Sequence, residues 1–185
     1  MRACPTCQAC DSRLTACSLA IDRPALFDRL LKLGASPNAI STSGETPLSV
    51  AVQTGSLRTI RSLLQAGADA KLGDVLHYAV EREGDELEVI GLLLAEGAPV
   101  DGVQFSHPIA RQLRLSLLRG TPLHKASLLG KSEVVKALLF HGANPNSTRV
   151  RGSQTELTTP FDIAKQRGDE RTVALFEDRG PSSRI

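Results

Sequence analysis

The chain has 185 residues, the size of one or two domains, and 41% of them are hydrophobic and 23% charged, as in an ordinary soluble globular protein. A formal net charge of +2 gives no reason to expect nucleic acid as the main partner. Aromatic residues make up only 3% and Trp is absent, so a core of Leu, Ala, Val and Ile is expected, in thin layers of small helices.

No stretch of the sequence approaches the roughly 18–20 uncharged apolar residues that a membrane-spanning helix needs. The first residues also lack the apolar stretch of a secretory signal. We therefore expect a soluble intracellular protein, cytoplasmic or nuclear, with no membrane partner.

The four cysteines are Cys4, Cys7, Cys10 and Cys17, all near the start of the chain. In these positions they cannot link the rest of the chain, so no disulfide framework is expected. Their spacing resembles half of a zinc motif, but the usual zinc sites use two separated pairs. We expect residues 1–10 to form a flexible, reduced tail and Cys17 to be a buried core residue. A zinc site on the four thiolates is the less favoured alternative.

Two short motifs then alternate along the chain. One is a pair of apolar residues that runs into Gly-Ala, at residues 30–38, 63–71, 93–101 and 138–146. The other precedes it and contains variants of Thr-Pro-Leu-His-x-Ala, at residues 14–20, 45–51, 74–79, 120–126 and 158–164. The glycines of the first motif, with Gly180 as a fifth, recur at intervals of 33, 30, 45 and 38 residues.

A period near 33 residues with this signature is typical of an ankyrin repeat. The sequence resembles the ankyrin-repeat family over about residues 11–180, with the best matches at 44–71 and 120–146. The resemblance implies an all-α solenoid of stacked helix-turn-helix units with short hairpin-like connecting loops. We expect units at residues 11–38, 39–71, 72–101, 102–146 and 147–180, an insertion at 102–119 and a tail at 181–185.

The residues of each unit have a physical reading. Thr46 and Thr121 are suited to cap the first helix, with Pro47 and Pro122 at its first position. Small alanines such as Ala51 and Ala126 let neighbouring first helices approach closely. The turn that follows is expected to place three glycines at positive φ, namely Gly55, Gly130 and Gly168.

The second helices carry apolar residues three and four apart. These stripes are Leu57, Ile60, Leu63 and Leu64, then Leu87, Ile90, Leu93 and Leu94, then Val134, Val135, Leu138 and Leu139. Gly67, Gly97 and Gly142 are expected to end these helices. Glu170 and Glu177 replace apolar residues in the last unit, which predicts a polar terminal cap, and the short first unit with Pro24 is expected to cap the other end.

The loops between units differ in length. Only three residues separate Lys71 from Asp74, so the third unit should lack most of its finger, whereas the loops before Thr121 and Thr159 are enlarged. In the longer insertion Ile109, Leu113 and Leu117 are spaced by four, and a short helix can start at Pro108. That helix either packs on its own solenoid or docks a partner with a basic edge.

Few side chains suggest chemistry. The resemblance implies that His77 and His124 are structural and bond loop backbone between repeats. His141 lies in a last helical turn, and His107 has no evident partner. The acidic residues Glu81, Glu83, Asp85, Glu86 and Glu88 lack metal-loop spacing, so a solvated edge or an acidic contact patch is expected. With no phosphate loop or nucleophile motif, we expect no catalytic residue, no enzyme activity and no cofactor.

The resemblance implies that a ligand lies along the concave face and is contacted by finger tips and the exposed side of the first helices. Leu128 and Leu129 are apolar where the pattern predicts solvent, so they either anchor an interface or pack under the adjacent insertion. The candidate partner-binding residues, including arginines of the insertion, are Thr42, Ser43, Glu45, Gln53, Thr54, Glu81, Arg82, Arg111, Arg114, Arg119, Leu128, Leu129, Gln166 and Arg167.

The resulting hypothesis is a monomeric, non-catalytic module that binds another protein as an adaptor, scaffold or inhibitor. Two alternatives stay open. One is a small accessory or catalytic factor with a pocket near residues 102–120. The other is a fragment of a larger multidomain ankyrin protein.

Overall fold

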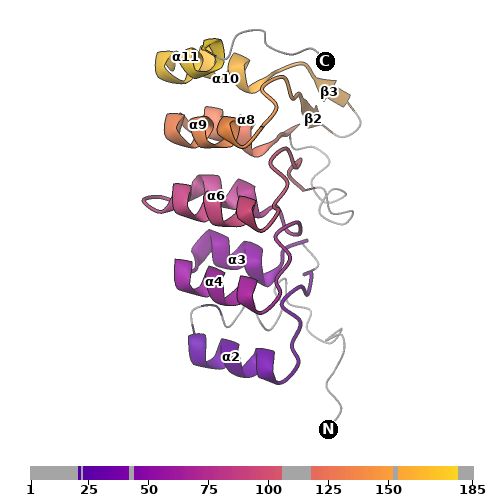
Figure 1. Cartoon of the computed structure of the whole chain (residues 1–185). Helices are drawn as coiled ribbons and strands as arrows, with labels where there is room; N and C mark the ends of the chain where they lie inside the picture. The colour runs from indigo at the N-terminus through magenta and orange to yellow at the C-terminus, as the bar shows by residue number, and fades with distance from the viewer. Residues whose placement is uncertain (1–20, 22, 42–43, 106–117, 152–153, 179–185) are drawn as a thin grey trace.

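The computed structural model describes residues 21, 23–41, 44–105, 118–151 and 154–178. Antiparallel helix pairs lie one above another along a single axis, as Figure 1 shows. The expected fold class, a solenoid of stacked helix-turn-helix units, is confirmed. In chain order the helices are α2 (Pro24–Lys32), α3 (Pro47–Thr54), α4 (Leu57–Gln65), α5 (Val75–Glu81), α6 (Glu86–Ala95), α8 (Pro122–Leu129), α9 (Ser132–Phe140), α10 (Pro160–Arg167) and α11 (Glu170–Glu177).

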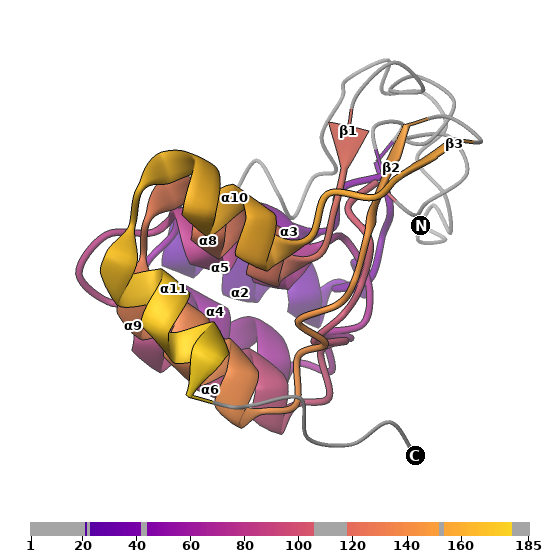
Figure 2. The same cartoon turned by 90° about the horizontal axis from the view of Figure 1, so that it is seen from above.

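The helices form two layers, which Figure 2 shows from above. In one layer the first helices of the pairs contact each other in the order α3, α5, α8 and α10. In the other layer α6 contacts α9, and α9 contacts α11. The core between the layers depends on four alanines that have no exposed surface, which are Ala51, Ala79, Ala126 and Ala164. A larger side chain at these positions would push neighbouring units apart.

The expected capping of the first helices is confirmed. Thr46 accepts a hydrogen bond from the backbone of Ser49, and the Ser49 hydroxyl accepts one from the Thr46 N–H in return. His124 closes the same box with Thr121, and Asp162 closes it with Thr159. These bonds from Thr159 lower the pKa of Asp162. Each box satisfies backbone donors that the first helical turn leaves open.

The start of α5 is different because its finger is short. Asp74 precedes the helix in the left-handed region and makes no cap bond with its side chain. Its carboxylate accepts a hydrogen bond from the Phe105 N–H at 2.6 Å instead. Gly73 lies so close to the previous unit that a Cβ there would be 2.7 Å from Oγ1 of Thr46. The third unit therefore closes directly against the start of α3, and its finger is short, as the three-residue spacing predicted.

The glycines of the turns follow the expectation with one correction. Gly67, Gly97 and Gly142 end their helices at positive φ, and Gly130 and Gly168 also have positive φ. The prediction for Gly55 was wrong, since its φ is −87° and its backbone is extended. A Cβ on Gly55 would lie 2.8 Å from the carbonyl oxygen of Ala51. Close approach, and not a left-handed turn, is what a side chain would disturb there.

The apolar stripes of the second helices are largely buried, again with one correction. Ile60 and Leu63 are fully buried in α4, as are Val135 and Leu138 in α9. In α6, however, Leu87 is 47% exposed, while Val89 is completely buried. The buried side of α6 is centred on Val89, Ile90 and Leu93, and at 100° per residue Leu87 falls outside it.

Three short strands form an antiparallel sheet on the finger side of the solenoid, beyond the helical layers in Figure 2. They are β1 (Leu118–Arg119), β2 (Arg149–Arg151) and β3 (Gln154–Glu156). Leu118 pairs with Arg151, and Arg149 pairs with Glu156. The sequence predicted hairpin-like loops but not this sheet, which joins the fingers of two neighbouring units.

Several expectations fall on residues that the structure does not describe. They are the cysteines and the tail at 1–10, the helix predicted from Pro108 with Ile109, Leu113 and Leu117, His107, and the tail at 181–185. In the final pair, Glu170 and Glu177 are exposed on α11, where the inner units have apolar residues.

Candidate functional site

The last residues of the first helices form one row along the solenoid, which is exposed except at Arg82. This row, which we call the first-helix row, has two positions for each of four units. Its members are Gln53 and Thr54 of α3, Glu81 and Arg82 at the end of α5, Leu128 and Leu129 of α8, and Gln166 and Arg167 of α10. All eight were predicted as candidate binding residues, and the stacking of the units aligns them along one side.

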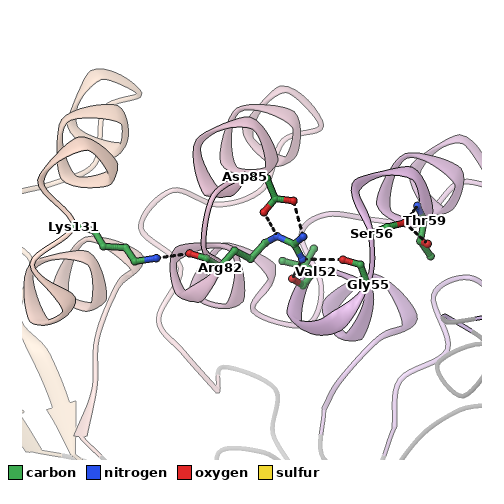
Figure 3. Close-up of polar contacts among 7 residues, drawn as sticks. All are labelled: Val52, Gly55, Ser56, Thr59, Arg82, Asp85 and Lys131. Carbon is green, nitrogen blue, oxygen red and sulfur yellow. Dashed lines mark hydrogen bonds and ion pairs between the residues drawn. The ribbon is translucent and has the colours of Figure 1, made fainter.

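Arg82 is held within the solenoid, as Figure 3 shows. Its Nε and Nη2 donate to the two carboxylate oxygens of Asp85 at 2.7 and 2.6 Å. Its Nη1 donates to the carbonyls of Val52 and Gly55 in the preceding unit, at 2.6 and 3.0 Å. The hydrogen bonds from Arg82 lower the pKa of Asp85. With its side chain only 12% exposed, Arg82 fastens two units together.

The same end of two further helices also receives a cation from the next unit. Arg167 occupies the repeat position of Arg82, and its Nη1 donates to the carbonyl of Leu128 at 2.7 Å. In the unit between them Leu129 stands at this position, and Lys131 donates from its Nζ to the carbonyl of Arg82 (Figure 3). Each cation lies at a helix C-terminus, where it offsets the partial negative charge of the unpaired carbonyls.

The middle of the row is flanked by two residues that sequence reasoning missed. Lys125 of α8 forms an ion pair with Glu81 at 2.5 Å, and its Nζ lies 6.0 Å from the centre of the Tyr78 ring. Tyr78 is the single tyrosine of the chain and directly follows His77. Its place three residues before Glu81, on the same side of a helix, was the available signal.

The predicted structural role of His77 and His124 is confirmed. Nε2 of His77 bonds the carbonyl of Gly120 at 3.0 Å, and Nε2 of His124 bonds that of Thr158 at 3.3 Å. Nδ1 of His124 accepts from the Thr121 N–H, which leaves its Nε2 to carry the proton of the neutral ring. Burial lowers the pKa of each imidazole to about 4. Both rings are therefore neutral at pH 7 and tie one unit to the finger of the next.

The remaining candidates differ in how accessible they are. Arg119 is only 5% exposed and its Nη1 lies 3.5 Å from the carbonyl of Phe105, so its side chain is interior. Glu45 is half-buried, and its N–H donates to the hydroxyl of Ser41. Thr54 is exposed and bonds the carbonyl of Val50. The other candidates, Thr42, Ser43, Arg111 and Arg114, lie outside the described residues.

The acidic residues of the third unit are mostly paired. Glu81 binds Lys125, Asp85 binds Arg82, and Glu88 binds Arg61 of the second unit at 2.8 Å. The expected solvated edge is therefore in good part a set of links to neighbouring helices. Within the described ranges, no three His, Cys, Asp or Glu side chains come together as a metal site would require.

Two protein-family models match most of the residues that form these units. Residues 14–104 match the family model for ankyrin repeats in three copies, and residues 120–149 match that for a single ankyrin repeat. The chain belongs to the ankyrin-repeat family. Ankyrin repeats are generally protein–protein interaction modules, and proteins built from them are generally non-catalytic binding modules.

Known proteins with similar sequences carry their ankyrin repeats within much longer chains. The potassium channel AKT1 of Arabidopsis thaliana is 32% identical over 95% of this chain and 22% of its own length. The mitochondrial disaggregase of Bos taurus is 33% identical over 75% of this chain and 19% of its own. The B-cell lymphoma 3 protein homolog of Mus musculus is 29% identical over 95% and 34%. This ankyrin-repeat chain thus spans about a third or less of these relatives.

In the part of the ankyrin stack that the structure describes, every helix is too short or too polar to cross a membrane. The pocket expected near residues 102–120 under the catalytic alternative falls on the undescribed residues 106–117.

Proposed function

We propose that this chain is a non-catalytic interaction module that binds a partner protein through the first-helix row and the adjacent finger tips. The observation that carries the proposal is a contrast between two sets of repeat positions. The buried position is Ala in all four units, at Ala51, Ala79, Ala126 and Ala164. The exposed position two residues further on is Gln53, Glu81, Leu128 and Gln166. A constant frame that presents variable side chains on one side suits recognition of one specific surface.

The composition of the middle of the row supports the same proposal. Tyr78 is half-buried beside the Glu81–Lys125 ion pair. The exposed Leu128 and Leu129 lie at the end of α8, the helix that carries Lys125. Interfaces concentrate binding energy in aromatic and apolar anchors surrounded by polar groups. We include in the proposal a monomeric state, since the exposed Glu170 and Glu177 make the outer side of α11 polar. The proposed division into five units at the boundaries given above goes with it.

The proposal is tested by comparing two variants in affinity capture from cells that express the gene. In the row variant, three exposed residues of the first-helix row are changed together, as Gln53→Arg, Leu128→Ser and Gln166→Arg. In the control variant, two exposed residues of the second helices are changed, as Arg58→Gln and Lys136→Gln. Circular dichroism establishes that both variants fold.

We expect mass spectrometry to find a protein that wild type and the control variant retain and the row variant loses. The proposal is wrong if the captured protein is lost from the control variant and kept by the row variant. It is equally wrong if both folded variants retain it.

A further inference from the structure

The exposed surface of α8 ends in two neighbouring leucines. Leu128 is 47% exposed and Leu129 is 43% exposed, although both stand at positions where the other units have polar residues. In the units on either side the equivalent residues are Glu81 with Arg82 and Gln166 with Arg167. Single exposed leucines are common on protein surfaces, but an adjacent pair in the middle of an otherwise polar row is a natural anchor point.

A guanidinium group lies directly beside this pair. Nη1 of Arg167 donates to the carbonyl of Leu128, and a Cβ on Gly130 would lie 2.9 Å from its Nη2. Arg167 is exposed, and among the described residues no carboxylate forms an ion pair with it. The carboxylate of Asp169, in the same unit, makes no ion pair with Arg167: both of its oxygens accept from Thr172, whose hydrogen bonds are the main cause of its lowered pKa, and the charge of Arg167 adds a smaller effect. The single bond to Leu128 leaves most of the five donors of the guanidinium open to solvent.

The charges on the two sides of the leucine pair differ. On the α5 side Glu81 is already neutralised by Lys125 at 2.5 Å. On the α10 side Arg167 is an exposed cation, while Nζ of Lys165 lies 4.6 Å from the centre of the Phe161 ring. An incoming carboxylate would therefore find an accessible cation on the α10 side, at Arg167, and none on the α5 side, where Lys125 is already paired with Glu81. The arrangement therefore selects both the chemistry of a ligand and its direction across the row.

We propose that the leucine pair and Arg167 form one docking site for an acidic, apolar peptide segment of the partner protein. A bulky apolar side chain of that segment packs on Leu128 and Leu129. A carboxylate next to it binds the open donors of Arg167, a geometry in which planar guanidinium and carboxylate groups can form two parallel hydrogen bonds. This inference rests on the proposed function and specifies the chemistry of its partner.

The test uses phage-displayed random dodecapeptides as the probe and the full chain as the bait. We expect the selected peptides to share an Asp or Glu close to a bulky apolar residue. A resynthesised peptide is then titrated calorimetrically. Replacing an exposed leucine, as Leu128→Ser or Leu129→Ser, should weaken its binding about tenfold, because burial of roughly half a leucine side chain is lost.

The proposed contact between Arg167 and a carboxylate of the peptide is tested by changing the charge at the neighbouring residue, Gln166. This residue is exposed, and its side chain makes no hydrogen bond in the described part of the chain. Gln166→Glu should weaken binding and Gln166→Lys should strengthen it, by about two- to threefold for a charge some 8 Å away in water. The matched control is Gln53→Glu, at the same repeat position three units away from Gln166, which should leave the affinity unchanged. Thermal unfolding of each variant shows that the fold is retained.

The inference is overturned if selection yields no acidic, apolar peptide, or if Leu128→Ser and the two Gln166 variants bind the peptide as wild type does. It is also overturned if Gln53→Glu changes the affinity as much as Gln166→Glu. Peptides that depend on Tyr78 or Gln53 instead would leave the proposed function standing while removing this site. Loss of the captured protein from the control variant, with the row variant retaining it, would remove the proposed function itself.

Discussion

The guanidinium of Arg82 donates a hydrogen bond to the carbonyl of Gly55 at 3.0 Å, across 27 positions of sequence. This contact joins the end of α5 to the end of α3, and the same Nη1 also reaches the carbonyl of Val52. The two carbonyls belong to the last turn and cap of a helix, which has no intrahelical donors for them. Arg82 therefore links two units and also supplies the missing hydrogen-bond donor to the carbonyls at the end of α3.

Arg82→Met should be strongly destabilising. It removes four hydrogen bonds and leaves Asp85 without its cation, so we expect the free energy of unfolding to fall by about 2–3 kcal/mol. Urea unfolding followed by circular dichroism measures the change. Arg171→Met is the control, since the ion pair of Arg171 with Glu133 is well exposed. Such surface pairs contribute about 0–1 kcal/mol. Equal effects of the two substitutions would contradict the role of Arg82.

Stability should fall between neutral pH and pH 4. Burial lowers the pKa of His77 and His124 from 6.5 to about 4, so the unfolded chain binds more protons than the folded one between these values. Their contribution is fully present above pH 6.5 and is lost as the pH falls toward 4. The lowered pKa values of Asp85 and Asp169 contribute stability that is fully present above their ordinary value of 3.8 and is lost only as the pH falls below it.

Urea unfolding at pH 7, 6, 5 and 4.5 measures this dependence. A His77→Gln variant supplies the comparison, because its amide can bond the carbonyl of Gly120 without titrating. We expect its stability to decline less over this range than that of wild type. Parallel declines would show that His77 does not contribute.

Gly73→Ala should cost more than the same change at Gly84. Both glycines have positive φ, at 77° and 90°, so Ala carries a backbone penalty of about 1–2 kcal/mol at either position. Only at Gly73 would the new Cβ also meet Oγ1 of Thr46, at 2.7 Å, whereas Gly84 has nothing within 4 Å. The melting temperature should therefore be lower for Gly73→Ala. Similar melting temperatures would mean that the short finger can shift aside.

The two sides of α6 should respond differently to substitution. Val89→Ala opens a cavity in a fully buried place and should cost about 1–3 kcal/mol in unfolding free energy. Leu87→Ser changes a half-exposed residue and should cost less than about 1 kcal/mol. Denaturant unfolding of both variants decides between this assignment and the stripe expected from sequence, under which Leu87 would be the costly position.

Much of the frame could be predicted because it depends on local rules. A threonine before a proline starts a helix, a glycine after an apolar stripe ends one, and the repetition of both marks the units. Those rules place Thr46, Thr121 and Gly67 correctly because each acts through its own backbone neighbours. The misassignment of Gly55 arose because its requirement is the proximity of Ala51, which no local rule conveys.

The candidate site could be predicted in position but not in detail. The repeat register aligned the first-helix row, since stacked units repeat their exposed positions. Which members remain accessible depends on contacts between units. Arg82 and Arg119 are both arginines in loops or helix ends, yet one clamps two units and the other is buried. The pairing of β1 with β2 likewise depends on two insertions meeting in space.

The cations at the ends of the first helices give the stack a direction. α3 is completed by Arg82, α5 by Lys131 and α8 by Arg167, so each helix depends on the unit that follows it in the chain. Fraying from the C-terminal end would strip α8 of its cation and then expose each earlier helix end in turn. Fraying from the N-terminal end would take no such cation from the units that remain. Within the described helices, unfolding of the C-terminal unit therefore destabilises the unit before it, whereas unfolding of the N-terminal unit removes no such cation from its neighbour.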